Sequence, residues 1–363
     1  MKSFVKIIVP KKIIVLLKKI RERHRLLCIS FFSKTSFLAN LYYSFHKAFS
    51  SEHVAVLKGR KLYYDSLKNV STTSVLLRRN IHRIEKGLIM RPRRLVFAEN
   101  YIIETVKCFA LATESTTFCE AEKKWAIDVL NSYFEIVKKT KTINLAYEIY
   151  SQINKEINLQ NLVDLFPNNE NKYSPYVKSN LPNANISFDT LKSLFIQRRS
   201  IRWYEDKTVD SNLIKKAVNI AALAPSACNR QPFKFIFCNE KEKVISIAES
   251  AGGIRGYAEN LPAIIVLTGD LSAYPFERDR HIIYIDSSLA AMQFMLALET
   301  LGLSSCVINW PESKNNYAKI RKIIDLEETQ QIIMLISVGY ADKQGYIPYS
   351  QKKQNELIFK EIK

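Results

Sequence analysis

The apolar pattern divides the chain into a helical N-terminal part and a C-terminal part in which helices and strands alternate. From Tyr63 to Leu165, apolar residues recur at helical spacing with few breaking residues. Beyond residue 188, short apolar runs typical of strands separate longer helical segments. These elements do not form a regular strand-helix-strand repeat, so we expect a mixed α+β sheet flanked by helices rather than a doubly wound parallel sheet. The expected strands are 232–238, 262–268, 306–309 and 331–338, and the expected helices are 241–250, 281–301 and 314–324.

A break in this pattern gives the domain boundaries. Residues 166–187 concentrate asparagine, serine and three prolines with little apolar periodicity, which is typical of a linker. A chain of 363 residues with 47% hydrophobic content can bury two cores. We therefore expect a basic amphipathic segment over 1–48, a helical domain over 49–165, the linker, and a second domain over 188–363.

The positive charge is concentrated at the N-terminus. The formal net charge is +19, and residues 1–60 contain 13 Lys and Arg against 2 Asp and Glu. The longest uncharged run among the basic pairs, Ile13 to Leu17, is too short to span a bilayer, and the segment has no signal-peptide cleavage site. Two interpretations stay open: an interfacial segment on anionic lipid, or a helix packed on its own domain with a basic solvated face. No nucleic-acid motif accompanies the charge, so we expect no specific nucleic-acid partner.

Cysteine, histidine and glycine usage excludes several classes of site. The six cysteines and five histidines show no metal-ligand spacing, which indicates a reduced, intracellular, metal-free protein. Cys228 and Cys306 are interpreted as packing residues rather than nucleophiles. The nine glycines form neither a dinucleotide-binding fingerprint nor a phosphate-binding loop, so a dedicated nucleotide domain is not expected.

Two polar clusters between residues 198 and 233 hold the candidate chemistry. The first contains Arg198, Arg199, Ser200 and Arg202, whose guanidinium groups can hold a phosphate dianion. In the second, two prolines fix a loop that presents polar groups suited to the edge of a flat heterocycle. Its candidate residues are Pro225, Ser226, Asn229 and Gln231. A helix capped by Asp210 or Ser211 joins the clusters.

The order and the amino-acid sequences of these clusters resemble those of the nitroreductase family of FMN-dependent oxidoreductases, over about residues 186 to 355. In that family, an Arg-x-Ser-x-Arg/Lys segment binds the FMN phosphate and ribityl chain, and an Ala-Pro-Ser-x-x-Asn-x-Gln-Pro loop lies against the isoalloxazine. The resemblance implies the nitroreductase fold, with two subunits building each FMN site. Arg198, Ser200 and Arg202 then match the phosphate set, beside Arg199. Pro225, Ser226 and Asn229 match the flavin-facing loop of the other subunit, and Gln231 supports that loop.

Two further stretches are candidate cofactor-binding segments on the resemblance alone. Pro311 and Glu312 fall where the family has a Pro-x-Glu-Gly segment near flavin N5 and O4, but Ser313 stands here in place of the glycine. Lys352 or Lys353 could be the basic residue that closes on the phosphate, although the family's usual arginine is absent. The resemblance assigns no catalytic acid or base to the protein, because FMN carries the reaction.

The segment 77–94 is dense in basic residues. A helix ending at Lys86, with Gly87 as a left-handed cap, would place Arg79, His82, Arg83 and Lys86 near one face. A similar His-Arg-x-Glu-Lys-Gly-Leu stretch occurs in long nitroreductase-like proteins, some apparently encoded beside cell-surface polysaccharide genes. Two interpretations stay open: a site for an anionic ligand, or a buried network from Glu85 to arginines that joins helices.

The leading hypothesis is an FMN-dependent NAD(P)H oxidoreductase that reduces a small-molecule acceptor, with an expected link to cell-surface polysaccharide metabolism. We expect a cytoplasmic homodimer. Contact of residues 1–48 with the inner face of the membrane is one of the two interpretations that stay open for that segment. The helical domain would control access, location or partner choice. The alternative is a non-catalytic scaffold or binding protein whose basic N-terminal domain lies at a membrane or an acidic polymer.

Overall fold

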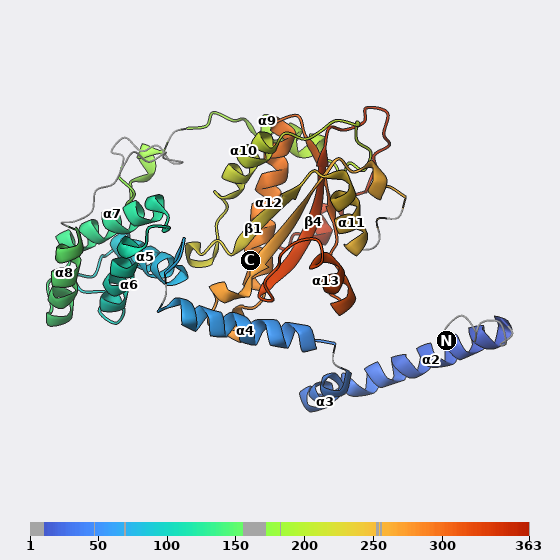
Figure 1. The fold of residues 1–363 in the computed structure, drawn as a ribbon, viewed down its shortest axis with the longest axis horizontal. Coiled ribbons are helices and arrows are strands. Elements are labelled where there is room, and N and C mark those ends of the chain that lie inside the picture. The colour runs from blue at the N-terminus through green and yellow to red at the C-terminus, as the bar shows by residue number, and fades with distance from the viewer. Residues whose placement is uncertain are drawn as a thin grey trace. The chain divides into compact units, whose positions relative to one another are not determined.

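The structure is a computed structural model of the chain and describes residues 11–46, 48–68, 70–154, 172–181, 183–251, 254 and 256–362. The chain forms two compact units, with the boundary between Val54 and Ala55. Figure 1 labels the helices and strands along the chain.

The first unit is helical. It contains α2 (Lys11–Phe32), α3 (Ser36–His46) and the first residues of α4 (Ser50–Ser66). The rings of Phe32 and Tyr42 join α2 to α3, with centroids 5.5 Å apart. From Lys12 to Phe32 every residue of α2 is exposed or half-buried, and α3 has no buried residue. Residues 1–10 and 47 of the expected basic segment lie outside the described residues.

A four-helix bundle follows in the second unit. Its helices are α5 (Val75–Leu88), α6 (Ile102–Glu114), α7 (Glu120–Ile136) and α8 (Lys141–Asn154). Their apolar faces enclose one core that includes Leu77, Ile81, Val106, Phe109, Leu130, Tyr133 and Ile143. The helical character that periodicity predicted is therefore present up to Asn154, and residues 155–171 lie outside the described part of the chain.

The expected end of α5 is wrong. The helix begins after Ser74, whose hydroxyl accepts a hydrogen bond from the Leu77 amide, and it continues through Gly87 to Leu88. Gly87 does not have the positive φ of a left-handed cap. A Cβ at this position would overlap the ring of Phe97, so Gly87 is suited to close packing within the helix.

The C-terminal part is an α+β domain, as expected. Its strands are β1 (Phe233–Cys238), β2 (Ala263–Asp270), β3 (Ser304–Ile308) and β4 (Gln330–Gly339), in the order β1-β2-β4-β3. All three strand pairs are antiparallel, and an isolated bridge between Ser200 and Ser305 adds a parallel pairing. The mixed character of the sheet thus comes from the segment that contains the arginine cluster.

Helices cover both faces of this sheet (Figure 1). The packing of α10 (Ser211–Ala221) and α12 (Ile282–Thr300) forms the core on one face. On the other face lie α11 (Lys241–Ala251) and α13 (Lys314–Ile320). The remaining helix, α9 (Phe188–Gln197), precedes the arginine cluster. Asp210 caps α10 by accepting a hydrogen bond from the Asn212 amide at 2.8 Å, which is one of the two expected caps.

The apolar character of α12 reflects its place in this core. Among the described residues, one helical segment, Glu277–Thr300, is long and apolar enough to cross a membrane by length and composition. Half of its most apolar stretch is buried inside the protein, and Ala290, Phe294 and Leu298 are fully or almost fully buried against the sheet. These contacts are those of a core helix.

The last part of α4 packs closely on the sheet domain. Ala55 and Val56 share a small core with Leu271 and Tyr274. One turn further along, a Cβ at Gly59 would lie 2.8 Å from the backbone carbonyl carbon of Leu271. A backbone atom cannot rotate away as a side chain can, so the glycine permits this close approach.

We expect the substitution Gly59→Ala to lower the free energy of unfolding by about 1–3 kcal/mol, because the added methyl overpacks the contact with Leu271. Alanine at an unobstructed helical site would instead stabilise the protein by roughly 0.5–1 kcal/mol. Urea unfolding followed by circular dichroism measures the sign. The exposed Leu57→Ala on the same helix is the matched control and should change stability by less than about 0.5 kcal/mol. A more stable Gly59→Ala protein would contradict the close packing of α4.

Candidate functional site

The arginine cluster lies on a backbone that is fixed to the sheet. Ser200 pairs with Ser305 of β3, and the amide of Ile201 donates to the Ser305 carbonyl at 3.1 Å. Three residues after Ile201, the buried Tyr204 hydroxyl donates to the Ile201 carbonyl at 2.7 Å and lies 2.8 Å from the Ser337 hydroxyl of β4. The short segment between α9 and Tyr204 is therefore held in place on the sheet.

Arg198, Arg199, Ser200 and Arg202 line one cavity of about 270 Å³. The C-terminal tail supplies the rest of its wall, from Pro348 to Lys352. The structure thus brings the four residues of the first cluster together with Lys352. Lys353 does not line this cavity, so of the two expected lysines only Lys352 lies at it.

The charge of this cavity is uncompensated. None of its three arginines forms an ion pair with any residue that the structure describes. The Nε of Arg198 is buried and has no hydrogen-bond partner in the described part of the chain. The nearby Glu299 is itself buried, and burial raises the pKa of its carboxyl against the opposing effects of a Gln197 hydrogen bond and Arg198. Guanidinium donors without a carboxylate partner fit a phosphate group.

Cys306 lies behind this cavity on β3. Its side chain is buried, and burial raises the pKa of its thiol, although Arg202, Arg198 and a hydrogen bond with Ser200 act in the opposite direction. A buried thiol with a raised pKa is a poor nucleophile. This environment suits the packing role expected for Cys306.

The second cluster forms a loop with an unusual backbone. The short turn η2 (Ala227–Asn229) lies within it, and Cys228, Asn229 and Gln231 have φ values of 53°, 50° and 49°. Left-handed backbone costs non-glycine residues roughly 1 kcal/mol each or more, so surrounding contacts must hold it. Within the loop, the Gln231 amide donates to the Ser226 hydroxyl at 3.1 Å, and the Gln231 side chain donates to the Ala222 carbonyl at 2.9 Å.

The sheet domain holds this loop through Asp286 of α12. The buried Asp286 carboxylate accepts hydrogen bonds from the Ala227 amide at 3.1 Å and from the Tyr274 hydroxyl at 2.7 Å. Burial is the main cause that raises the pKa of Tyr274, so this hydroxyl remains a proton donor. The loop is therefore anchored at its start to a core helix.

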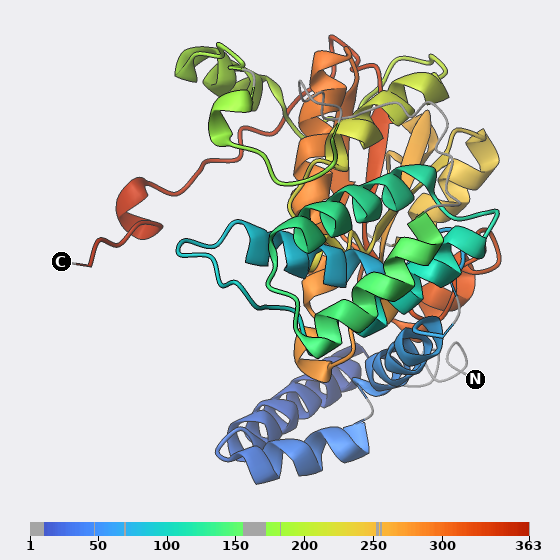
Figure 2. The same ribbon diagram turned by 90° about the vertical axis from the view of Figure 1, so that its left-hand side faces the viewer.

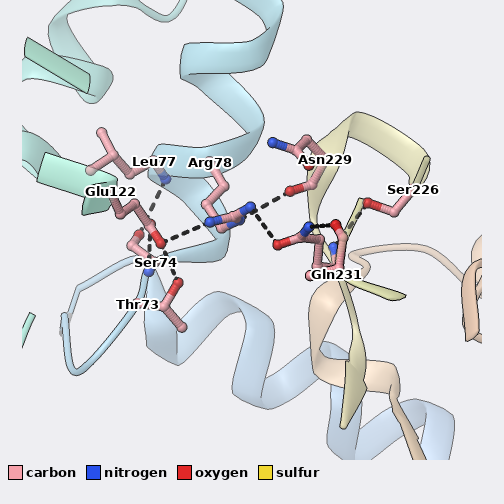
Figure 3. A network of polar contacts seen from close by, with 9 residues as sticks. Thr73, Ser74, Leu77, Arg78, Glu122, Ser226, Asn229 and Gln231 are labelled. Atoms are coloured by element: carbon pink, nitrogen blue, oxygen red, sulfur yellow. Dashed lines mark hydrogen bonds and ion pairs between the residues drawn. The ribbon is translucent and has the colours of Figure 1, made fainter. Parts of the chain in front are cut away.

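The helical bundle holds the same loop through Arg78 of α5 (Figure 3). The Arg78 guanidinium donates to the Asn229 carbonyl at 3.0 Å, to the Gln231 side-chain oxygen at 2.9 Å and to Glu122 at 3.0 Å. Glu122, in the first turn of α7, is buried and also accepts from the Thr73 hydroxyl at 2.7 Å and the Ser74 amide at 3.2 Å. Sequence reasoning noted the basic segment beginning near Arg78 but did not single out Arg78 or Glu122.

The rest of the basic segment forms helix-joining contacts with partners other than those expected. Glu85 accepts from the Trp125 indole at 2.9 Å and lies 3.3 Å from His82, so it does not pair with arginines. Arg79 instead contacts the Tyr63 hydroxyl and, at 3.5 Å, Glu104. Arg83 lies over the Tyr101 ring at 3.7 Å from its centroid. The expected buried network from Glu85 to arginines is therefore wrong, and the carboxylates that pair with arginines of this segment are Glu122, with Arg78, and Glu104, with Arg79.

The segment after β3 contains Ser313, which stands where the family has a glycine, and the structure gives this serine a role. Glu312 accepts a hydrogen bond from the Tyr284 hydroxyl of α12 at 2.6 Å, and the Pro311 carbonyl accepts one from the Asn316 side chain at 3.3 Å. The hydroxyl of Ser313 accepts from the Asn316 amide at 3.1 Å and so caps α13. Since Ser313 has an extended φ of −149°, no glycine is required at this position.

Within one chain, the loop and the arginine cavity lie at opposite ends of α12. Near one end, Asp286 binds the loop, and near the other, Glu299 accepts from Gln197, which adjoins Arg198. These two positions are 13 residues apart, or about 20 Å at a rise of about 1.5 Å per residue. Pro225, Ser226, Asn229, Gln231, Pro311 and Glu312 do not line the arginine cavity. The structure of one chain therefore does not bring all the expected site residues together.

Comparisons with known proteins agree on the C-terminal half. The model of the Nitroreductase family matches residues 196–259 and 248–340. The chain is 30% identical over 154 residues to a putative NADH dehydrogenase/NAD(P)H nitroreductase of Archaeoglobus fulgidus, covering 42% of this chain and 85% of that protein. A protein of the same description from Methanothermobacter thermautotrophicus is 28% identical over 143 residues, covering 39% of this chain and 73% of that protein. A solved FMN-dependent nitroreductase from Clostridium difficile is 26% identical, with a TM-score of 0.39 over 45% of this chain and 94% of that chain.

Proposed function

This chain belongs to the nitroreductase family, as its sequence predicted, and on that premise we propose that it is an FMN-dependent NAD(P)H oxidoreductase acting on a small-molecule acceptor. The observation that carries the proposal is the cavity lined by Arg198, Ser200 and Arg202, whose arginines have no described carboxylate partner. The polysaccharide link rests on the His82 to Leu88 stretch alone, and we propose it only as the place to search for the acceptor.

In this proposal the chain binds and orients its cofactor. Arg198 and Arg202 hold the phosphate by charge-assisted hydrogen bonds, Ser200 supports the ribityl chain, and Lys352 closes the cavity from the tail. The loop from Pro225 to Gln231 supplies the surface against which the ring lies. When bound, FMN supplies the hydride chemistry, so the chain needs no acid or base of its own.

Removing the two arginines tests this assignment. We expect Arg198→Ala combined with Arg202→Ala to abolish FMN retention, because a phosphate of about −1.5 to −2 charge would lose its main partners. Lys353→Ala, next to the cavity but outside its wall, is the matched control and should retain flavin. The visible absorbance of each purified protein is measured before and after anaerobic NADH or NADPH.

Wild-type protein should be yellow and should bleach with the nicotinamide. A double variant that retains full flavin would refute the site assignment. A wild-type protein that takes up no added FMN would favour the non-catalytic binding protein instead.

We propose that the site is completed by a second copy of this chain. The arginine cavity and the loop are separated by about 20 Å along α12, farther than one phosphate and a five-carbon ribityl chain can span. The C-terminal tail extends away from the sheet (Figure 2) and exposes Tyr346, Tyr349, Leu357, Ile358, Phe359 and Ile362. Exposed apolar residues at Ile285 and Leu289 of α12 offer a further surface that a second copy would cover.

Mixed dimers test this arrangement. One protomer carries Arg198→Ala with Arg202→Ala, and the other carries Asn229→Trp, whose larger side chain would occupy the place of the ring. Neither variant alone should bind FMN. The mixture should regain about a quarter of the wild-type flavin, since random pairing makes about half of the dimers mixed and each mixed dimer has one intact site of two. Flavin content after co-refolding is the readout. Failure of the mixture to regain flavin, with copurification of two differently tagged protomers showing that mixed dimers formed, would contradict a shared site.

We also propose that the first unit binds the anionic inner face of the membrane, which would place the protein in the cytoplasm at that surface. At about 100° per residue, one side of α2 carries Ile13, Leu17, Ile20, Leu27 and Phe31, each between 47% and 63% exposed. The remaining sides carry Lys12, Lys18, Lys19, Arg21, Arg23 and Arg25. An apolar stripe flanked by cations fits anionic lipid, because the apolar side chains can enter the acyl boundary while the cations contact the anionic headgroups.

Vesicle flotation of the full-length protein tests membrane binding. We expect it to float with vesicles of phosphatidylcholine and phosphatidylglycerol, to float less with pure phosphatidylcholine, and to be released by high salt. Leu17→Glu with Ile20→Glu should reduce flotation by about tenfold or more, because two charges would enter the apolar stripe. Leu26→Glu, equally exposed but off the stripe, is the matched control. A wild-type protein that does not float with anionic vesicles would refute the proposal. So would a Leu17→Glu with Ile20→Glu protein whose only change is its oligomeric state in the absence of lipid.

A further inference from the structure

We propose that Arg78 is a positioning residue for the flavin-facing loop, so that the helical bundle outside the matched family region sets the competence of the flavin site. This inference rests on the proposed function. It assigns to the bundle a role in the site itself.

The first support is the geometry of the guanidinium. Its three nitrogens each donate to a different acceptor, and two of these acceptors, the Asn229 carbonyl and the Gln231 side chain, belong to the loop (Figure 3). Arginine can make these contacts together because its donors lie in a rigid planar fork. One side chain thus fixes two points of the loop separated by a single residue.

The second support is that the orientation of the Arg78 side chain is itself fixed. Its side chain is 16% exposed, and that of its partner Glu122 is 3% exposed. Glu122 is held by Thr73 and Ser74, at the entry to α5, so the carboxylate cannot follow a displaced guanidinium. The guanidinium carbon also lies 5.5 Å from the centroid of the Trp125 ring. The bundle therefore presents a preset donor to the loop.

The third support is that the loop needs contacts from outside to keep its backbone conformation. Asn229 and Gln231 both have left-handed backbone, which requires outside contacts to persist. Asp286 anchors the loop at Ala227, before these residues, and Arg78 anchors it at both of them. The Asn229 side-chain amide makes no hydrogen bond with any described residue and so remains available to a ligand. Arg78 thus holds the Asn229 backbone carbonyl and leaves the Asn229 side-chain amide free to contact a ligand.

A conservative variant separates positioning from simple stability. Arg78→Lys keeps a cation beside the buried Glu122, but one ammonium nitrogen replaces three donor nitrogens in a fixed planar fork and cannot reproduce the geometry of the two loop contacts. Arg79→Ala, on the next position of α5, removes an arginine that contacts Tyr63 and Glu104 rather than the loop. Each full-length protein is measured by hydrogen exchange of peptides covering residues 224–233 without cofactor, and by FMN titration.

We expect Arg78→Lys to exchange the loop amides about tenfold faster or more and to weaken FMN binding by about tenfold or more, with little change at the bundle core. Arg79→Ala should leave both readouts near the wild-type values. Unchanged loop exchange in Arg78→Lys would overturn the positioning role. Faster exchange with unchanged FMN affinity would reduce Arg78 to a structural contact and also overturn the inference.

The proposed function fails in a distinguishable way. If wild-type protein binds no FMN, the cofactor assignment falls and this inference falls with it, whatever the exchange rates show. If wild-type protein binds FMN and the Arg78→Lys readouts equal those of wild type, the oxidoreductase assignment stands and only the role of Arg78 is refuted.

Discussion

Arg78 is the residue that connects the helical bundle to the loop from Pro225 to Gln231, and its buried ion pair with Glu122 of the same bundle holds it there. Burying two charges is costly, and the pair is tolerated because Glu122 also accepts from Thr73 and Ser74 while Arg78 donates to the loop. Removing one partner of such a pair typically costs about 3–5 kcal/mol, since the other charge is left buried and unpaired. The bundle and the sheet domain therefore share one polar network at this loop.

The predictable features were those carried by local patterns. The α+β class followed from apolar periodicity, and the arginine cavity formed because Arg198, Ser200 and Arg202 are close in sequence on one anchored segment. Contacts distant in sequence were not predictable. Nothing local marks Glu122, in the first turn of an amphipathic helix, as the buried partner of Arg78, 44 residues away. Glu85, which sequence reasoning chose, lies close to arginines in sequence but binds Trp125 instead.

Two single residues show that the local sequence does not determine what a residue does in the fold. A glycine after a basic helix usually indicates a left-handed cap, but Gly87 lies within α5 because Phe97 occupies the space of a side chain. Ser313, which replaces a family glycine, caps α13 with extended backbone. In both cases packing or capping determines the residue, and that information exists only in the three-dimensional structure.

A crystal structure of the full-length protein grown with FMN would show directly which residues hold the cofactor. We expect the phosphate at Arg198 and Arg202 of one copy and the ring against the Ser226 to Asn229 loop of the second copy, with Arg78 still bonded to the Asn229 carbonyl. A flavin held entirely by one copy, or a loop that binds the ring after releasing Arg78, would contradict this arrangement.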